Sequence, residues 1–172
     1  MSLLLVLVLS MLPANPWVAV APTPCWQPPV DAPVVEPYRA PPCTYCAGNR
    51  GIEYGPSPGQ TVSAVAEGAV TFAGSVAGTR YVVVQHVDGI RATYGRLASR
   101  TVAVGDAVRV GQRIGTTTDS LYFGLRAGEV PVDPTALLGV RTYPTRLVPT
   151  DGTPSPGVRP GRLVCRNAAG ER

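Results

Sequence analysis

Histidine and lysine are the residues that this chain has least of. Its 172 residues contain one histidine, His86, and no lysine, so all 15 basic residues are arginines. A catalytic zinc ion is usually held by three protein ligands, often imidazoles, so a single histidine makes a histidine-bound zinc ion implausible. The net charge is +4, yet no arginine run is interleaved with aromatic residues as a nucleic-acid groove would need. We therefore expect no nucleic-acid partner.

Charged and aromatic residues are also scarce, whereas turn-forming residues are abundant. Charged residues make up 15% of the chain, and glycine and proline contribute 19 residues each. Such a composition predicts many turns, short strands and few long helices. The hydrophobic content of 45% excludes a chain that is disordered throughout, and the length suffices for one domain with a core. We expect an all-β protein with a compact antiparallel β-sheet or sandwich core.

The N-terminal apolar run, residues 3–12, is too short to span a bilayer. Prolines and a small-residue stretch ending at Ala21 follow it, which is typical of a secretory signal. We therefore predict a signal peptide at residues 1–21 and a location outside the cytoplasm, secreted or in the cell envelope. The alternative is an uncleaved anchor, because no basic residue precedes the run, and only then would the protein contact a bilayer.

Four cysteines accompany this export signal. In an exported chain, two disulfides are the expected state. Three connectivities are possible, and the spacing does not choose among them. A zinc knuckle would need a second close pair beside the CxxC, but the other two cysteines lie alone near the two ends. The disulfide candidates are Cys25, Cys43, Cys46 and Cys165.

Composition divides the rest of the chain into three parts. The proline-rich segment 22–48, which carries three of the cysteines, should form an extended arm over the core. Residues 49–139 form the predicted β-sheet core. Residues 140–172 are rich in Pro, Gly and Arg and read as an irregular basic tail held by Cys165. The apolar residues expected to anchor the arm are Trp26, Val34, Val35 and Tyr38.

Short apolar runs punctuated by glycine predict the strands of the core. The runs are residues 61–66, 69–76, 81–87 and 90–97. Asp88 and Gly89 separate the last two and predict a hairpin with a two-residue turn, because Asp-Gly supplies positive φ angles. A further strand is predicted at 121–126. Its period of two places Leu121, Phe123 and Leu125 on one face and Ser120, Tyr122 and Gly124 on the other.

The order of these landmarks resembles the core of the lysostaphin-type, LytM-like zinc metallopeptidases, which cleave peptidoglycan cross-bridges. The resemblance covers just over half of the chain, from Asn49 to Leu138. It rests on the segments Gly59–Ala64, Glu67–Val70 and Ala73–Gly74, on the hairpin at 82–97, on Gly105–Val108 with Gly111–Gly115, and on the strand at 121–126 followed by Val132–Pro134. Few folds share that sequence of turns.

The resemblance also shows which residues stand at the family's functional positions. The family binds zinc through the His and Asp of HxGxD and the second His of HLH, where this chain has Asn49, Glu53 and Tyr122. The family's two catalytic histidines correspond to Arg96 and Ser120. Losing two imidazole ligands should lower zinc affinity by at least about 10⁴-fold, and neither Arg96 nor Ser120 shuttles protons near neutral pH. We expect no catalytic residue, no metal and no cofactor, and a relict groove lined by these five residues.

Individual side chains allow sharper expectations. Arg96 could supply to Glu53 the positive charge that zinc supplies in the family, and the alternative is that both are solvated groups on a loop rim. His86, beside the predicted hairpin turn, should be structural because no Asp, Glu or Cys cluster accompanies it. Tyr94 should pack in the core. For Tyr122, packing and a place in the groove are both open.

Three functions from different classes fit these observations to different degrees. The first is a catalytically inactive envelope module that binds peptidoglycan or regulates a cell-wall hydrolase. The alternative is an active peptidoglycan endopeptidase with a non-standard metal site, using Glu53 with Asn49, Tyr122 or the CxxC cysteines. The third is a lipoyl or biotinyl carrier, because the domains that carry these groups also have repeated Gly-turn-Val elements. It is excluded because those groups are attached to lysine, which this chain lacks.

Overall fold

The computed structural model describes residues 25–145, 150, 157 and 161–165. The predicted signal peptide at 1–21 lies outside this part of the chain. Within it, no helix has the length and apolarity needed to cross a membrane. The described chain is built almost entirely of strands, with one short 3-10 helix, η1 (Pro134–Ala136), as the predicted all-β class requires.

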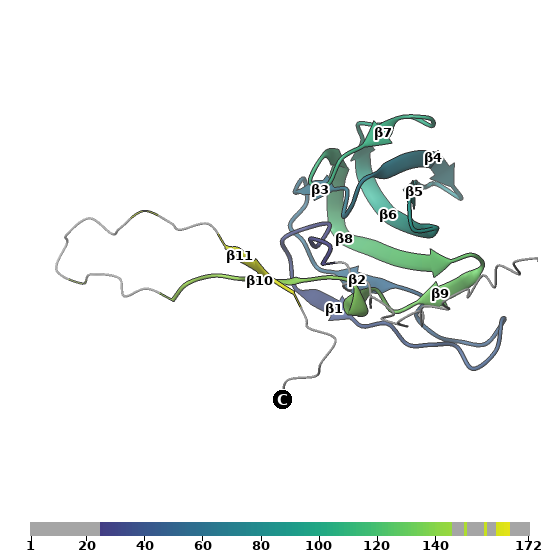
Figure 1. The fold of residues 1–172 in the computed structure, drawn as a ribbon, viewed down its shortest axis with the longest axis horizontal. Coiled ribbons are helices and arrows are strands. Elements are labelled where there is room, and N and C mark those ends of the chain that lie inside the picture. The colour runs from purple at the N-terminus through teal and green to yellow at the C-terminus, as the bar shows by residue number, and fades with distance from the viewer. Residues whose placement is uncertain (1–24, 146–149, 151–156, 158–160, 166–172) are drawn as a thin grey trace, which may run out of the picture.

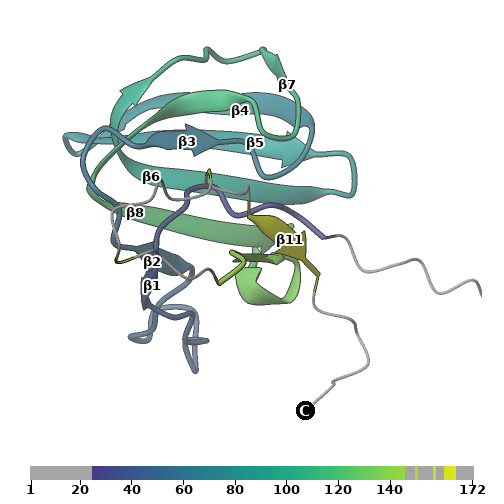
Figure 2. The ribbon, with the colours of Figure 1, turned by 90° about the vertical axis from the view of Figure 1, so that its left-hand side faces the viewer.

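Nine strands form one curved antiparallel sheet (Figures 1 and 2). The order across the sheet is β1-β2-β8-β6-β5-β4-β7, and β3 and β9 also pair with β8. The sheet consists of β1 (Val34–Glu36), β2 (Ile52–Tyr54), β3 (Thr61–Ser63), β4 (Gly68–Val76), β5 (Thr79–His86), β6 (Ile90–Arg100), β7 (Ala107–Val108), β8 (Arg113–Ala127) and β9 (Val130–Val132).

The long strand β8 organises the sheet. One of its edges pairs with β6 along most of its length, and three short strands, β3, β2 and β9, pair with successive parts of the other edge. The predicted alternation is confirmed, because Leu121, Phe123 and Leu125 are fully buried while Tyr122 points to the opposite face. The strand begins eight residues earlier than the predicted 121–126.

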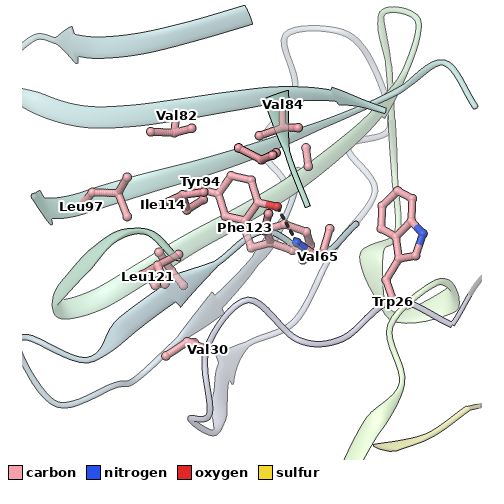
Figure 3. Packing of buried hydrophobic residues seen from close by; sticks show 14 of the residues in the cluster. Trp26, Val30, Val65, Val82, Val84, Tyr94, Leu97, Ile114, Leu121 and Phe123 are labelled. Atoms are coloured by element: carbon pink, nitrogen blue, oxygen red, sulfur yellow. Dashed lines mark hydrogen bonds between the residues drawn. The ribbon is translucent and has the colours of Figure 1, made fainter. Parts of the chain in front are cut away.

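The core lies against the face of the sheet that carries these three residues (Figure 3). Tyr94, fully buried as predicted, packs its ring against Phe123 at a centroid distance of 5.2 Å. Its hydroxyl accepts a hydrogen bond from the backbone N–H of Val65 at 3.0 Å. That bond explains why β3 ends at Ser63 rather than at the predicted residue 66: Val65 donates to a side chain instead of a neighbouring strand.

The predicted hairpin between β5 and β6 is present, but the predicted turn type is wrong. The loop has three residues, 87–89, and only Gly89 has a positive φ, 82°. Asp88 instead accepts a hydrogen bond from the N–H of Ile90 through its side chain, which closes the turn without a left-handed Asp. The two-residue turn with two positive φ angles lies between β4 and β5, at Ala77 (47°) and Gly78 (80°).

The arm is part of the folded unit from Trp26 onward. Trp26 and Val30 are buried, and the backbone of Trp26 exchanges hydrogen bonds with Leu137 and Gly139. The prediction that Val34 and Val35 anchor the arm is wrong. Both are exposed, because residues 34–36 form β1, an edge strand held to β2 by its backbone rather than by burial of its side chains.

The segment after η1 has more regular structure than the predicted irregular tail. Strands β10 (Val140–Thr142) and β11 (Arg162–Val164) pair as a two-stranded ribbon that lies beside β1 and β2 (Figure 1). A disulfide between Cys25 and Cys165, the terminal disulfide, ties this ribbon to the start of the arm. Cys43 and Cys46 form the CxxC disulfide. The structure thus selects one of the three connectivities.

Candidate functional site

Adjacent strands carry four of the five residues predicted to line the groove, and the fifth, Asn49, lies just before β2. In the antiparallel register, Glu53 of β2 lies directly opposite Tyr122 of β8, which in turn lies opposite Gly95 of β6. Arg96 follows Gly95, and Ser120 lies two residues before Tyr122 on the same strand. The site therefore sits on the face of the sheet opposite the core, across β2, β8 and β6.

Arg96 and Glu53 form the ion pair that the sequence suggested. The guanidinium Nη1 donates to Oε2 of Glu53 at 2.5 Å and Nη2 donates to Oε1 at 2.8 Å, so both carboxylate oxygens are engaged. The Glu53 side chain is 18% exposed and that of Arg96 is 41% exposed. The two hydrogen bonds between them, rather than burial, oppose the alternative of two separately solvated groups. The hydrogen bonding that Arg96 donates to Glu53 is the largest influence on its guanidinium and raises the pKa of that group.

The backbone directs Arg96 toward this partner. Arg96 has a φ of 63°, in the left-handed region that side chains rarely adopt. It sits at a β-bulge in both pairings of β6, because the register shifts between Gly95 and Leu97 against β8 and at the facing residues of β5. A bulge re-aims a side chain, and here it turns the guanidinium over the neighbouring strands. Such strain persists only where surrounding structure holds it.

Asn49 is a structural brace in this arrangement. It is 8% exposed, its amide nitrogen donates to the carbonyl oxygen of Pro37 at 3.0 Å, and its amide oxygen accepts from the N–H of Gly51 at 3.4 Å. The backbones of Asn49 and Arg39 also exchange two hydrogen bonds. Asn49 therefore fastens the arm to the start of β2, and both polar ends of its side chain are in use.

Tyr122 lies flat against two glycines. A methyl group added at Gly51 would meet its ring at 2.8 Å, and one added at Gly124 would meet its hydroxyl at 2.6 Å. Burial of the half-covered ring is the main cause that raises the pKa of the Tyr122 phenol, although the charges of Arg126 and Arg50 oppose the rise. The phenol is therefore neutral near pH 7. Of the two possibilities for Tyr122, packing is shown by these contacts, and a place in a ligand groove stays a prediction.

Two more aromatic rings on this face were missed in the sequence. Tyr81 of β5 lies opposite Gly95, and a methyl group at Gly95 would meet its ring at 2.5 Å. Phe72 of β4 covers Gly74 in the same way, at 3.1 Å. Glu53, Tyr122, Gly95, Tyr81 and Gly74 are successive partners across five strands. Glycines at strand positions that face away from the core are the signal that could have revealed this row of rings.

Ser120 and the neighbouring threonine border the site. The hydroxyl of Thr118 lies 3.0 Å from the carbonyl oxygen of Arg96 and 2.9 Å from that of Ser120. The N–H of Ser120 donates to the same hydroxyl at 3.3 Å. Thr118 therefore connects the bulge in β6 to the stretch of β8 that carries Ser120 and Tyr122.

The donor set at this place does not fit a zinc ion. The Glu53 carboxylate is held on both oxygens by a guanidinium, and its strand partner Glu36 is paired with Arg39. The amide of Asn49 is engaged by the backbone, and the phenol of Tyr122 is neutral. No three His, Cys, Asp or Glu side chains in the described residues are grouped so that they could hold a metal ion. The arrangement offers a paired cation, a phenol hydroxyl and aromatic faces, which suit recognition of a ligand.

His86 belongs to the opposite face of the sheet. It is 4% exposed, and its Nδ1 lies 2.6 Å from the carbonyl oxygen of Glu67, so Nδ1 carries the proton and donates it. The ring stacks at a tilt on Trp26 with centroids 4.8 Å apart. The structural role predicted for His86 agrees with this placement, since the imidazole joins the arm to β4 and β5.

Comparisons with known proteins cover the same part of the chain. The model of peptidase family M23 matches residues 47–134. Murein hydrolase activator NlpD of Salmonella dublin is 30% identical over 129 residues, which are 70% of this chain and 33% of that protein. Murein hydrolase activator EnvC of Escherichia coli is 38% identical over 98 residues, 52% of this chain and 23% of EnvC. This chain thus spans a third or less of these curated relatives.

A solved structure agrees with the fold. Helicobacter pylori Csd3 superposes with a TM-score of 0.60 at 23% identity, and the match covers 73% of this chain and 37% of Csd3. At that identity the likeness concerns the fold alone. It supports the predicted lysostaphin-type core.

Proposed function

Because this chain belongs to peptidase family M23, we propose that it is an envelope module of that family without peptidase activity. Its site binds peptidoglycan or a cell-wall hydrolase and so regulates hydrolysis by another protein. The observation that carries this proposal is the bidentate contact between Arg96 and Glu53. The guanidinium of Arg96 binds the carboxylate at the position where the family has a zinc ligand. A metal ion would therefore have to displace a cation held by two charge-assisted hydrogen bonds.

The relatives support a regulatory role. Both NlpD and EnvC are named murein hydrolase activators. The site of this chain keeps what binding needs, because the sheet, the glycine-seated aromatic rings and a charged centre remain on one exposed face. It lacks a proton shuttle near pH 7, since Arg96 stays charged and the phenol of Tyr122 stays neutral.

A location outside the cytoplasm is part of the proposal. Two disulfides persist in oxidising compartments and are rare in the cytoplasm of mesophiles. The apolar N-terminal segment supports export in the same way. Separation of cytoplasmic from extracytoplasmic fractions, followed by immunoblotting for this protein, tests the location.

Two assays with the purified, oxidised protein test the function. Co-sedimentation with isolated peptidoglycan sacculi measures wall binding. Dye release from labelled sacculi, with a murein hydrolase added alone or together with this protein, measures regulation. We expect binding or stimulation that falls in the Tyr81→Ala and Tyr122→Ala variants and persists in Arg113→Ala, which changes an exposed residue of the same sheet. Failure of the wild type in both assays would remove the proposal.

The alternative of an active endopeptidase has its own readout. Elemental analysis should find no stoichiometric metal, and sacculi treated with this protein alone should release no cross-bridge peptides. Stoichiometric metal together with release that stops in Glu53→Ala would establish the alternative and refute the inactive module.

A further inference from the structure

A hollow next to Tyr122 has no part in the site described so far. Its volume is about 590 Å³, within the range of small-molecule and peptide sites. One wall comes from the arm, from Tyr38 to Thr44, and the other from the turn between β8 and β9. The hydroxyl of Tyr38 donates to the carbonyl oxygen of Pro131 at 3.2 Å and holds the two walls together.

Two arginines line this hollow. Arg50 is anchored at the CxxC loop, because its Nη2 donates to the carbonyl oxygens of Thr44 at 2.6 Å and Cys46 at 3.3 Å. Both of its hydrogen bonds within the described chain come from that one nitrogen, so most of its N–H donors are left for a ligand. Arg126 extends from β8 on the same face as Tyr122, and its side chain is 44% exposed.

The charges around the hollow do not balance. Glu129 also lines it, but this carboxylate is held by Arg91 at 2.5 Å and lies 3.5 Å from Arg126. Arg91 does not line the hollow but pairs with Glu129, so the two lining guanidinium groups, Arg50 and Arg126, remain as an excess of two positive charges. The nearby Glu36 and Glu53 are paired with Arg39 and Arg96 and add no free negative charge.

The hollow lies close to Tyr122, although none of its lining residues belongs to the site. Gly51 follows Arg50 directly and supports the ring of Tyr122, and Arg126 lies four residues after Tyr122 along β8. The hydroxyl of Tyr122 lies over Gly124, two residues before Arg126, and Tyr122 is also the strand partner of Glu53. A ligand in the hollow could therefore continue across Tyr122 toward Arg96.

We propose that this hollow is a binding subsite for an acidic peptide, in which Arg50 and Arg126 bind a free carboxylate and Tyr122 contacts the adjoining peptide. Guanidinium groups recognise carboxylates with directed, charge-assisted hydrogen bonds. The apolar parts of Pro41, Val130 and Pro131 in the walls suit small aliphatic side chains. The identity of the peptide rests on the proposed function, because a protein that binds peptidoglycan would meet the acidic stem peptides of that polymer.

Titration calorimetry of the full, oxidised protein tests the subsite. The probe is a soluble muropeptide with free carboxylates, and its fully amidated counterpart is the matched ligand control. We expect the amidated ligand to bind about tenfold or more weakly. Arg50→Gln and Arg126→Gln should each weaken binding of the acidic ligand by about tenfold, whereas Arg113→Gln should leave it unchanged. Affinity should also fall as salt is raised.

The outcomes separate this inference from the proposed function. Equal affinity for the free and amidated ligands, or full affinity in the Arg50→Gln/Arg126→Gln variant, would overturn the subsite even if the protein still binds sacculi. If inorganic phosphate competes as well as the acidic muropeptide, the arginines form a general anion site and the peptide assignment is wrong. Binding of the acidic muropeptide without any binding of sacculi or effect on a hydrolase would support the subsite and refute the proposed function.

Discussion

The ion pair between Arg96 and Glu53 makes a quantitative prediction about stability. Replacing Arg96 with alanine removes both hydrogen bonds and leaves the Glu53 carboxylate, 18% exposed, without its cation. Hydrogen bonds to charged groups contribute about 1.5–3 kcal/mol when buried, and exposed ion pairs contribute about 0.2–1 kcal/mol. Arg96 is 41% exposed, so solvent screening places this pair between the two ranges. We expect a coupling energy of about 1–1.5 kcal/mol.

Backbone strain at Arg96 can be measured separately. Its φ of 63° costs an alanine as much as an arginine, whereas glycine adopts it freely. Glycine also gains more freedom in the unfolded chain, which reduces the benefit. Arg96→Gly should therefore be about 0.5–1 kcal/mol more stable than Arg96→Ala. The comparison reports the bulge, because both variants lack the ion pair.

A double-mutant cycle in urea measures the coupling energy of the pair between Arg96 and Glu53. Free energies of unfolding are measured for the wild type, Arg96→Ala, Glu53→Gln and the double variant, all with the disulfides intact. Equal m-values across the cycle would show that the compactness of the native and unfolded states is unchanged. A coupling energy within about 0.3 kcal/mol of zero would refute the bidentate pair as a stabilising contact. Arg113→Ala, an exposed residue in the same sheet, serves as the control.

Three further predictions follow from other parts of the structure. From loop entropy alone, the terminal disulfide, with a sequence separation of 140, should stabilise the fold by about 5 kcal/mol, and the CxxC disulfide, with a separation of 3, by about 2 kcal/mol. Urea unfolding of variants in which the cysteines of each pair are replaced by alanine checks this order. Burial raises the pKa of the Tyr54 and Tyr94 phenols above the value in the unfolded chain. Above about pH 10 these two phenols therefore ionise only in the unfolded state, and the free energy of unfolding should fall by about 1.4 kcal/mol per pH unit for each tyrosine. Urea titrations at pH 8 and pH 11 test the sign, and constant stability would contradict it. Gly51→Ala places a methyl group 2.5 Å from the carbonyl oxygen of Phe123 and should cost about 2 kcal/mol or more, so a thermal midpoint equal to that of the wild type would show that β2 can shift.

The sheet could be predicted from the sequence because the local pattern of apolar residues agrees with their burial in the fold. The alternation of Leu121, Phe123 and Leu125 requires a strand with one buried face, and the structure buries all three. The turn at Asp88-Gly89 shows the limit of local signals. Two- and three-residue loops share the same dipeptide, and the hydrogen bond from the N–H of Ile90 to the side chain of Asp88 accompanies the three-residue form.

The sequence nominated residues for the candidate site but did not settle the contacts between them. Family landmarks nominated Asn49, Glu53, Arg96, Ser120 and Tyr122. The structure sets Glu53 opposite Tyr122 and pairs it with Arg96, whereas the Asn49 side chain bonds to the arm. That Asn49 is a brace, and that Arg50 and Arg126 flank Tyr122, follows from the path of the arm. Residues 37–50 lie in the loop between β1 and β2, whose two sides are bridged at Arg39 and Asn49, and no periodicity in a proline-rich segment indicates where such a loop will lie.

By itself, the sequence determined what this protein is made of and what it lacks: an antiparallel sheet punctuated by glycines, four cysteines, a single histidine and no lysine. These follow from residue identity, because periodicity dictates strands and an absent imidazole can bind nothing. Only the tertiary structure decided the disulfide pairing, the bidentate contact of Arg96 with Glu53 and the charged hollow beside Tyr122. Each depends on distances between segments far apart in the chain, and those distances are set by packing of the whole sheet against its arm.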